Sequence, residues 1–188
     1  MPWIKELIEI LNRQRKHASF FEWPEKDIKE LGVVKALFES MQKNGHTTYF
    51  DPISYKNDPP DCIARYTNGE AVAIEVSELV DFKTIIDSEH NEGTYKIWEN
   101  EEIIKNLEQI TSEKEQKVLN GGPYKSSMLV VFTDEPFIEP DEIATALKKH
   151  HFNKSRLYDE IYLLFSYDPR IHSYPYVKLN ISGNNRLG

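Results

Sequence analysis

Two short runs of mostly apolar residues limit what this chain can fold into. Residues 126–133 (SSMLVVFT) and 160–166 (EIYLLFS) are rich in aliphatic side chains and too short for ordinary helices, so both are predicted to be buried strands. Each follows a stretch with helical periodicity, at 100–119 and from Pro140 to about His150. The Asn-Gly-Gly-Pro sequence at 120–123 ends the first of these helices. The sequence therefore predicts strands and helices that alternate in this half of the chain.

The N-terminal half is expected to supply two helices and three strands. Residues 3–12 have apolar side chains at helical spacing, and a second helix is predicted from Pro24 to Asn44-Gly45. The apolar positions of the first helix are Trp3, Ile4, Leu7, Ile8 and Leu11, and a basic patch of Arg13, Arg15, Lys16 and His17 follows it. A strand at 46–51, a loop from Pro52 to Pro60 and a hairpin made by 61–66 and 70–78 come next.

This order of elements predicts an α/β fold with a central mixed sheet flanked by helices. The 188 residues suit one domain of ordinary size. We therefore expect a single domain over 1–188, with an N-terminal helical extension at 1–23 and a core at 25–180. Residues 79–98 are acidic and have no clear pattern, and a polar tail is expected after Leu179.

Composition narrows the class of protein. The net charge is −8, which argues against a non-specific coat for nucleic acid but leaves room for a locally basic groove. The single cysteine, Cys62, rules out an internal disulfide and is expected to be a small core side chain. The N-terminus lacks the features of a signal peptide, and no apolar run is long enough to span a membrane. We expect a cytoplasmic protein.

The predicted hairpin carries two acidic residues in apolar surroundings. Asp61 begins one strand, and Glu75 interrupts the aliphatic run of the other. If Asn68-Gly69 is a two-residue turn, the two carboxylates point to opposite faces; if Thr67-Asn68-Gly69 is the loop, Asp61 lies directly across from Glu75. We favour the three-residue loop, because it places five small or apolar residues on one face: Cys62, Ala64, Val72, Ile74 and Val76.

Two carboxylates opposite each other would repel and would raise each other's pKa. A hard divalent cation removes this conflict, and oxygen ligands of this kind suit Mg²⁺, with Mn²⁺ as the alternative ion. The plainer interpretation is that both residues are solvent-facing charges on an edge strand.

The hairpin resembles the signature of the restriction-endonuclease-like superfamily, the PD-(D/E)xK nucleases. Pro60-Asp61 matches the first half of that signature, and Glu75-Val76-Ser77 matches the second half except at its last position. The surrounding order of elements also resembles this fold, with its αβββαβ core, over roughly residues 25–180. The resemblance implies a Mg²⁺-dependent endonuclease that hydrolyses phosphodiester bonds in DNA, with RNA left open as a substrate.

Ser77 stands where the superfamily usually has a lysine, and several of its branches are thought to supply that lysine from the next helix. On the predicted helix 100–119, an apolar stripe is formed by Ile103, Leu107, Ile110 and Val118. Lys114 falls within this stripe and Lys117 at its margin, so both are candidate catalytic lysines. Both would otherwise complement the dipole at an exposed helix end.

The resemblance also implies further ligands. Asp61, Glu75 and the main-chain carbonyl of Val76 would bind the metal, and the superfamily often adds a glutamate from its first core helix. Glu30 and Glu39 are the candidates for that glutamate, and both are otherwise surface charges.

Substrate and partner contacts are predicted from charge and from tyrosines. The stretch 148–156 has no acidic residue and four basic ones, which are candidates for phosphate binding or simply a solvated helix end: Lys148, Lys149, Lys154 and Arg156. The 10 tyrosines, including those of Tyr174-Pro175-Tyr176, also suit a protein partner or a homodimer. Two alternative functions stay open: a catalytically degenerate module with the nuclease fold that binds nucleic acid or a protein, and a hydrolase that uses Asp61 and Glu75 as an acid/base pair.

Overall fold

A six-stranded mixed sheet forms the centre of the part of the chain that the computed structural model describes, residues 25–55, 59–81 and 97–181. Its strands lie side by side in chain order: β1 (Tyr49–Ser54), β2 (Cys62–Tyr66), β3 (Ala71–Glu78), β4 (Ser126–Thr133), β5 (Glu160–Phe165) and β6 (Tyr176–Lys178). The strands β3, β4 and β5 are parallel to one another, and the other neighbours are antiparallel. The expected α/β class with a mixed sheet is confirmed.

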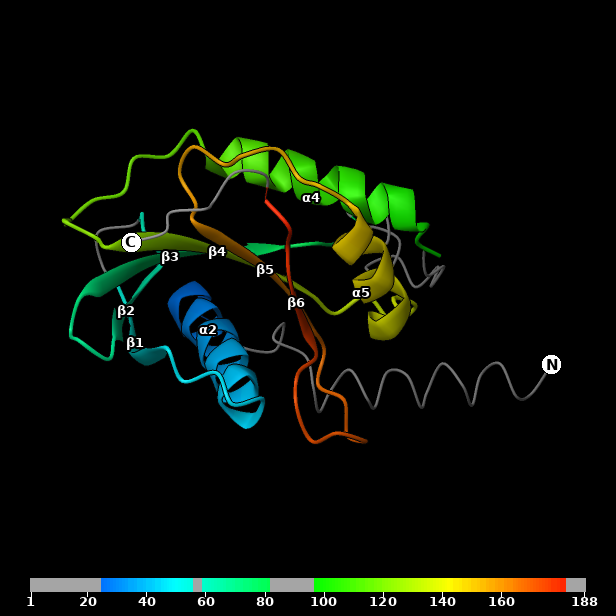
Figure 1. Ribbon diagram of the computed structural model, residues 1–188, viewed down its shortest axis with the longest axis horizontal. Coiled ribbons are helices and arrows are strands. Elements are labelled where there is room, and N and C mark those ends of the chain that lie inside the picture. The colour runs from blue at the N-terminus through cyan, green and yellow to red at the C-terminus, as the bar shows by residue number, and fades with distance from the viewer. Residues whose placement is uncertain (1–24, 56–58, 82–96, 182–188) are drawn as a thin grey trace.

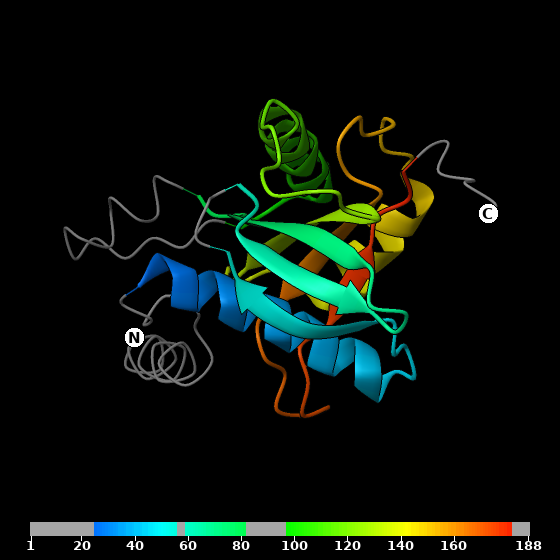
Figure 2. The same cartoon turned by 90° about the vertical axis from the view of Figure 1, so that its left-hand side faces the viewer.

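Helices cover both faces of this sheet (Figure 1). The helix α2 (Lys26–Lys43) lies on one face, and α4 (Asn100–Lys114) and α5 (Pro140–Lys149) lie on the other. Turning the molecule by 90° shows α4 above the sheet and α2 below it (Figure 2). The fold therefore has three layers, and a residue on β3 faces either α2 or α4.

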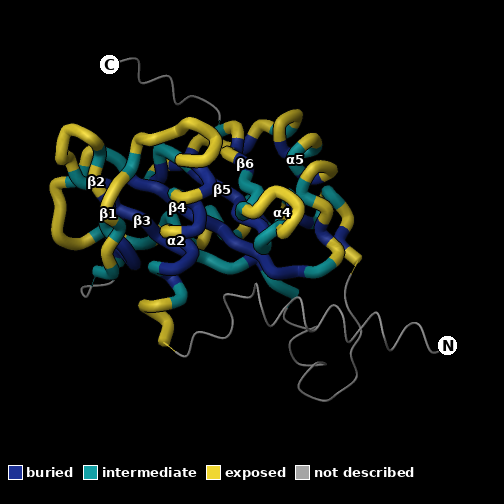
Figure 3. The backbone as a smooth tube through the Cα atoms, turned by 90° about the horizontal axis from the view of Figure 1, so that it is seen from below, coloured by how far each residue is buried: buried dark blue, intermediate teal, exposed yellow. Residues whose placement is uncertain are grey.

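The two interlayer spaces are filled by two separate apolar cores. The side chains between α2 and the sheet include Val33 and Leu37 from the helix and Val72 and Ile74 from β3. The other core joins α4 and α5 to the sheet and includes Leu107. The strands β3, β4 and β5 are mostly buried, whereas the loops around them are exposed (Figure 3). Burial of aliphatic side chains on both faces explains why β4 is almost continuously apolar.

The hairpin has the predicted three-residue register. Cys62 pairs with Ile74 and Arg65 with Ala71, so paired residue numbers sum to 136. The five residues expected on one face all belong to the core beside α2: Cys62, Ala64, Val72, Ile74 and Val76. Gly69 has a φ of +84°, the left-handed conformation that the turn requires of it.

Several elements differ from the sequence prediction, including the strand expected to begin at residue 46, which begins at Tyr49. The loop expected from Pro52 is strand as far as Ser54, because β1 is an edge strand with an irregular register between Phe50 and Ile53, where a proline is tolerated. The helix expected over 100–119 ends at Lys114. The short edge strand β6 was not predicted, because three residues after Pro175 carry little periodic signal.

Some sequence predictions lie outside the described residues. These are the helix at 3–12, the basic patch at 13–17 and most of the acidic stretch 79–98. Among the helices of the described chain, none combines the length and apolar character needed to cross a bilayer.

Cys62 gives a test of the core beside α2. Its side chain is inaccessible, and burial, helped by the nearby charge of Asp61, raises the pKa of the thiol to about 12. Because the thiolate is the reactive form, we expect the folded protein to react with a disulfide reagent at pH 8 at least about 100-fold more slowly than protein unfolded in guanidinium. Absorbance of the released thiolate follows the reaction at this single cysteine. Rapid stoichiometric labelling of native protein would contradict the assigned packing.

Candidate functional site

The candidate site lies where β2 begins, beside the middle of β3. The main chain before β2 is held by two hydrogen bonds: Tyr55 N–H donates to the carbonyl of Asp61 at 3.0 Å, and Asn120 N–H donates to that of Pro59 at 2.8 Å. Glu75 occupies a central strand position, paired with Leu129 of the parallel neighbour β4. Both acidic residues are therefore fixed by regular main-chain contacts.

Asp61 and Glu75 are both buried, with 4% and 0% of their surfaces exposed. The Asp61 Oδ2 atom accepts a 2.7 Å hydrogen bond from Val76 N–H, the residue directly after Glu75. The Lys114 ammonium contacts both carboxylates, so the two acids meet at one place. The interpretation of these residues as solvent-facing edge charges is wrong.

Two lysines compensate the buried charge of Glu75. Lys114 Nζ lies 3.2 Å from Glu75 Oε2 and donates a 2.8 Å hydrogen bond to the carbonyl of Val76. Lys117 Nζ donates to the same Glu75 oxygen at 2.6 Å. A buried carboxylate needs such partners, because an unpaired charge in the core is strongly destabilising.

The helix α4 brings Lys114 to this point. Ile103 and Leu107 anchor the helix in the core, and Lys114 lies on the same stripe, so its side chain faces the sheet. A capping box between Glu99 and Glu102 begins the helix. At the other end, the buried Tyr158 hydroxyl donates to the carbonyl of Lys114 at 3.3 Å. The stripe stops there.

Lys117 lies beyond the end of α4, in the turn that follows it. Its N–H donates to the carbonyl of Lys114 at 3.2 Å, which folds the chain back and keeps the second lysine close to the first. Val118, which we expected to extend the apolar stripe, is 77% exposed. Lys117 therefore reaches Glu75 from a turn and not from a helix face.

Of the two glutamates proposed on the first core helix, the structure places Glu30 near the site. Glu30 is buried, and Lys26 Nζ lies 3.4 Å from Glu30 Oε1 and 3.8 Å from Asp61 Oδ1. Glu39 is exposed further along α2, where its charge acts on Tyr174. The site thus gathers three carboxylates and three ammonium groups, and Glu39 is not among them.

The surroundings act on Asp61 in opposite directions. Burial raises the pKa of its carboxyl group above the ordinary value, the Val76 N–H lowers it, the Glu75 carboxylate raises it and the two lysines lower it. The pKa that results is raised. Asp61 is therefore held in a place where its charged form is disfavoured until more positive charge is supplied.

The oxygens of the site suit a hard divalent cation. Asp61 Oδ1 and Glu75 Oε1 are buried and accept no hydrogen bond, although the Lys26 ammonium lies 3.8 Å from Asp61 Oδ1. Together with the Val76 carbonyl they offer the oxygen ligands that Mg²⁺ takes alongside waters and substrate phosphates. Within the described residues, no three His, Cys, Asp or Glu side chains are arranged to hold a metal by themselves. The fit therefore rests on two carboxylates and a main-chain carbonyl.

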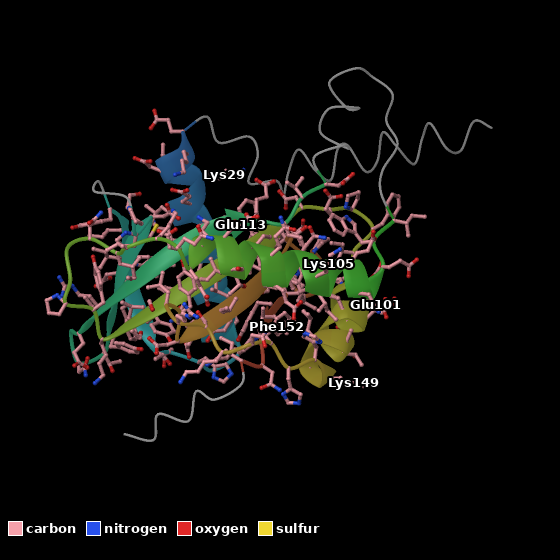
Figure 4. The ribbon with its side chains drawn as sticks, turned by 90° about the horizontal axis from the view of Figure 1, so that it is seen from above. Lys29, Glu101, Lys105, Glu113, Lys149 and Phe152 are labelled. Atoms are coloured by element: carbon pink, nitrogen blue, oxygen red, sulfur yellow. The ribbon has the colours of Figure 1, made fainter. Side chains whose placement is uncertain are left out.

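The structure separates the four predicted basic residues into two pairs. Lys154 and Arg156 are exposed on a segment that is tied to the end of α4, because Arg156 N–H donates to Glu115 Oε1 at 3.1 Å. Lys148 and Lys149 are exposed in the last turn of α5. Figure 4 shows Lys149 well away from Glu113, near the opposite half of α4.

The tyrosines at 174 and 176 contribute to the fold itself. Both are partly buried against the core beside α2, and the Tyr176 ring packs edge-on against Tyr162, with 6.2 Å between the ring centroids. The Tyr174 N–H donates to the Ser40 hydroxyl at 3.1 Å. These contacts account for two of the tyrosines that the sequence offered for a partner, and a homodimer stays a prediction.

Sequence reasoning missed two residues of the site. Lys26 lies one turn before Glu30 on α2, and this i, i+4 spacing of opposite charges was a usable signal. Tyr158 supports the end of α4, and burial, followed by the charges of Glu75 and Asp61, raises the pKa of its hydroxyl. No local sequence pattern marks a residue that acts through a contact between such distant segments of the chain.

Comparison of the chain with protein-family models, with curated proteins and with solved structures found no match.

The raised pKa of Asp61 predicts that its charge destabilises the metal-free fold. For an acid of this kind, stability is greatest below the ordinary pKa of 3.8 and is lost as the pH rises through the raised value. We therefore expect Asp61→Asn, whose amide oxygen can still accept from Val76 N–H, to raise the free energy of unfolding at pH 7.5 by about 1 kcal/mol. The gain should shrink towards pH 4. Denaturant titrations in EDTA at both pH values measure it, and a loss of stability at pH 7.5 would refute the prediction.

Proposed function

We propose that this protein is a Mg²⁺-dependent endonuclease that hydrolyses phosphodiester bonds in DNA. The observation that carries the proposal is the convergence of Asp61, Glu75 and the Val76 carbonyl on one buried point, with two lysine ammonium groups beside them. Carboxylates that each have an oxygen without a hydrogen bond, a carbonyl and adjacent ammonium groups are the components of metal-assisted phosphoryl chemistry.

The arrangement of elements supports the finer assignment to the restriction-endonuclease-like fold. The order α2, β1, β2, β3, α4, β4 follows the αβββαβ core of that superfamily, and Asp61 and Glu75 occupy the signature positions. The departure at Ser77 is offset in this arrangement, because α4 and its following turn supply two ammonium groups to Glu75.

The residues would divide the work as follows. Asp61, Glu75 and the Val76 carbonyl would hold the Mg²⁺ ion. The bound ion would polarise the phosphate and lower the pKa of a bound water. A lysine ammonium beside Glu75 would orient the attacking water or stabilise the charge that develops on the phosphate oxygens. Burial of the carboxylates strengthens these electrostatic interactions, because little water screens them.

The strand of DNA would approach over the end of α4. Lys154 and Arg156 lie on the segment that bonds to Glu115, the residue directly after Lys114, so this basic segment runs beside the end of α4. Local positive charge of this kind offsets the net charge of −8 where a phosphate backbone would lie.

Nuclease activity is tested with Glu75→Gln and Glu70→Gln as a matched pair. Both glutamates belong to the same hairpin, but Glu70 is exposed in its turn and Glu75 is buried at the site. We expect cleavage of plasmid or oligonucleotide DNA in Mg²⁺ or Mn²⁺ to fall on the order of 100-fold or more in Glu75→Gln and to be unchanged in Glu70→Gln. Gel electrophoresis of the products, with EDTA as the blank, measures the activity.

RNA oligonucleotides run in parallel identify the preferred substrate. If Glu75→Gln still cleaves the substrate, or if cleavage continues in EDTA, the proposed site is refuted. Absence of cleavage by the native protein, with retained DNA binding, would instead favour a catalytically degenerate binding module.

The two basic pairs give a test of the DNA path. Replacing Lys154 and Arg156 by Ala should lower DNA affinity about 10-fold and reduce the slope of log K against log salt by about 2, because two phosphate contacts are lost. The same replacement of Lys148 and Lys149 should have little effect. Fluorescence anisotropy with a labelled duplex in Ca²⁺ over a range of salt concentrations measures both quantities. A larger effect of the α5 pair would place the DNA over the end of α5 and not over the end of α4.

A further inference from the structure

The ammonium of Lys114 contacts the same three groups that are proposed to bind the metal. Its Nζ atom lies 2.8 Å from the Val76 carbonyl oxygen, 3.2 Å from Glu75 Oε2 and 3.9 Å from Asp61 Oδ2. These oxygens belong to the two carboxylates and the main-chain carbonyl that the resemblance assigns to Mg²⁺, and the carboxylate oxygens that accept no hydrogen bond are the other two, Asp61 Oδ1 and Glu75 Oε1. We propose that Lys114 is a built-in competitor of the metal: its ammonium neutralises the same two carboxylates in the metal-free protein and must withdraw when a divalent ion binds.

The buried carboxylates explain why the metal-free protein needs the Lys114 ammonium at this place. Glu75 is inaccessible and Asp61 nearly so, and buried carboxylates close to each other require a counter-charge. Because Lys114 is part of α4, its ammonium can supply that charge in the absence of a metal ion. A divalent ion supplies more charge at the same place and leaves the ammonium without its acceptors.

Lys114 has room to leave. Its side chain is 20% exposed, and its main chain ends α4, where Tyr158 and the turn hold the carbonyl and not the side chain. Rotation of the side chain towards solvent is therefore compatible with an unmoved helix. In that state Lys117, which donates to Glu75 Oε2 from the turn, is the ammonium that stays beside the carboxylates.

The inference rests on the proposed function, because it assumes that a divalent ion binds between Asp61 and Glu75. It goes further in dividing the lysines: Lys114 sets the affinity for the metal, and Lys117 is the lysine that acts with the bound metal.

Metal affinity tests the competition without any use of activity. We expect Lys114→Met to bind Mn²⁺ about fivefold or more tightly than the native protein, because the competing ammonium is gone. The matched control is Lys105→Met, which removes the same charge from the exposed face of the same helix (Figure 4). Its affinity should equal that of the native protein. Isothermal titration calorimetry gives the dissociation constants, and circular dichroism checks that each variant is folded.

A second measurement uses the native protein and needs no variant. Acetylation of lysines followed by peptide mass spectrometry reports how accessible each amine is. With saturating Mn²⁺, the acetylation rate of Lys114 should rise severalfold, whereas that of the exposed Lys105 should stay constant.

The outcomes separate this inference from the proposed function. If the native protein binds Mn²⁺ but Lys114→Met binds it equally or less tightly, or if acetylation of Lys114 does not rise, the competition is refuted and the metal site stands. If neither the native protein nor Lys114→Met binds Mn²⁺, both proposals fail. Tighter binding by Lys114→Met together with faster acetylation of Lys114 establishes the competition.

Discussion

The rest of the site depends on the burial of Glu75 in the middle of a sheet. A carboxylate with no exposed surface, on a strand covered by helices on both faces, cannot be left without positive charge nearby. The end of α4 has to lie where it does because two lysines must reach that one oxygen. The same demand aligns Asp61, since the Val76 N–H that it accepts from belongs to the residue next to Glu75. The burial of the Glu75 carboxylate therefore constrains the positions of two strands, a helix and a turn.

Much of this arrangement could be predicted from local patterns. The register of the hairpin follows from its turn and from the face that has to be apolar, and this was enough to bring Asp61 beside Glu75. Lys114 could be found because helical periodicity places it on the stripe of Ile103 and Leu107. In each case the period of the apolar residues, two in a strand and 3.6 in a helix, indicates the face on which a side chain lies.

What could not be predicted depends on contacts between distant segments. The end of α4 is set in part by a hydrogen bond from Tyr158, a residue that comes after β4 in the sequence. The periodic apolar stripe alone therefore predicted a helix that was five residues too long. Lys26 reaches Asp61 only because α2 passes the beginning of β2. The strand β6 is held by its pairing with β5 and by core contacts of Val177, not by its own three residues.

The position of the lysines at the end of α4 and in the turn after it has a consequence for how such a site can change over time. The carboxylates of Asp61 and Glu75 belong to the hairpin, whereas the ammonium groups of Lys114 and Lys117 belong to the end of a helix, and to its following turn, that aliphatic packing joins to the sheet. The distance between the two halves of the site is then set by the sizes of core side chains such as Leu107. Substitutions in the hydrophobic core can in this way change the geometry of the site without any change to a charged residue.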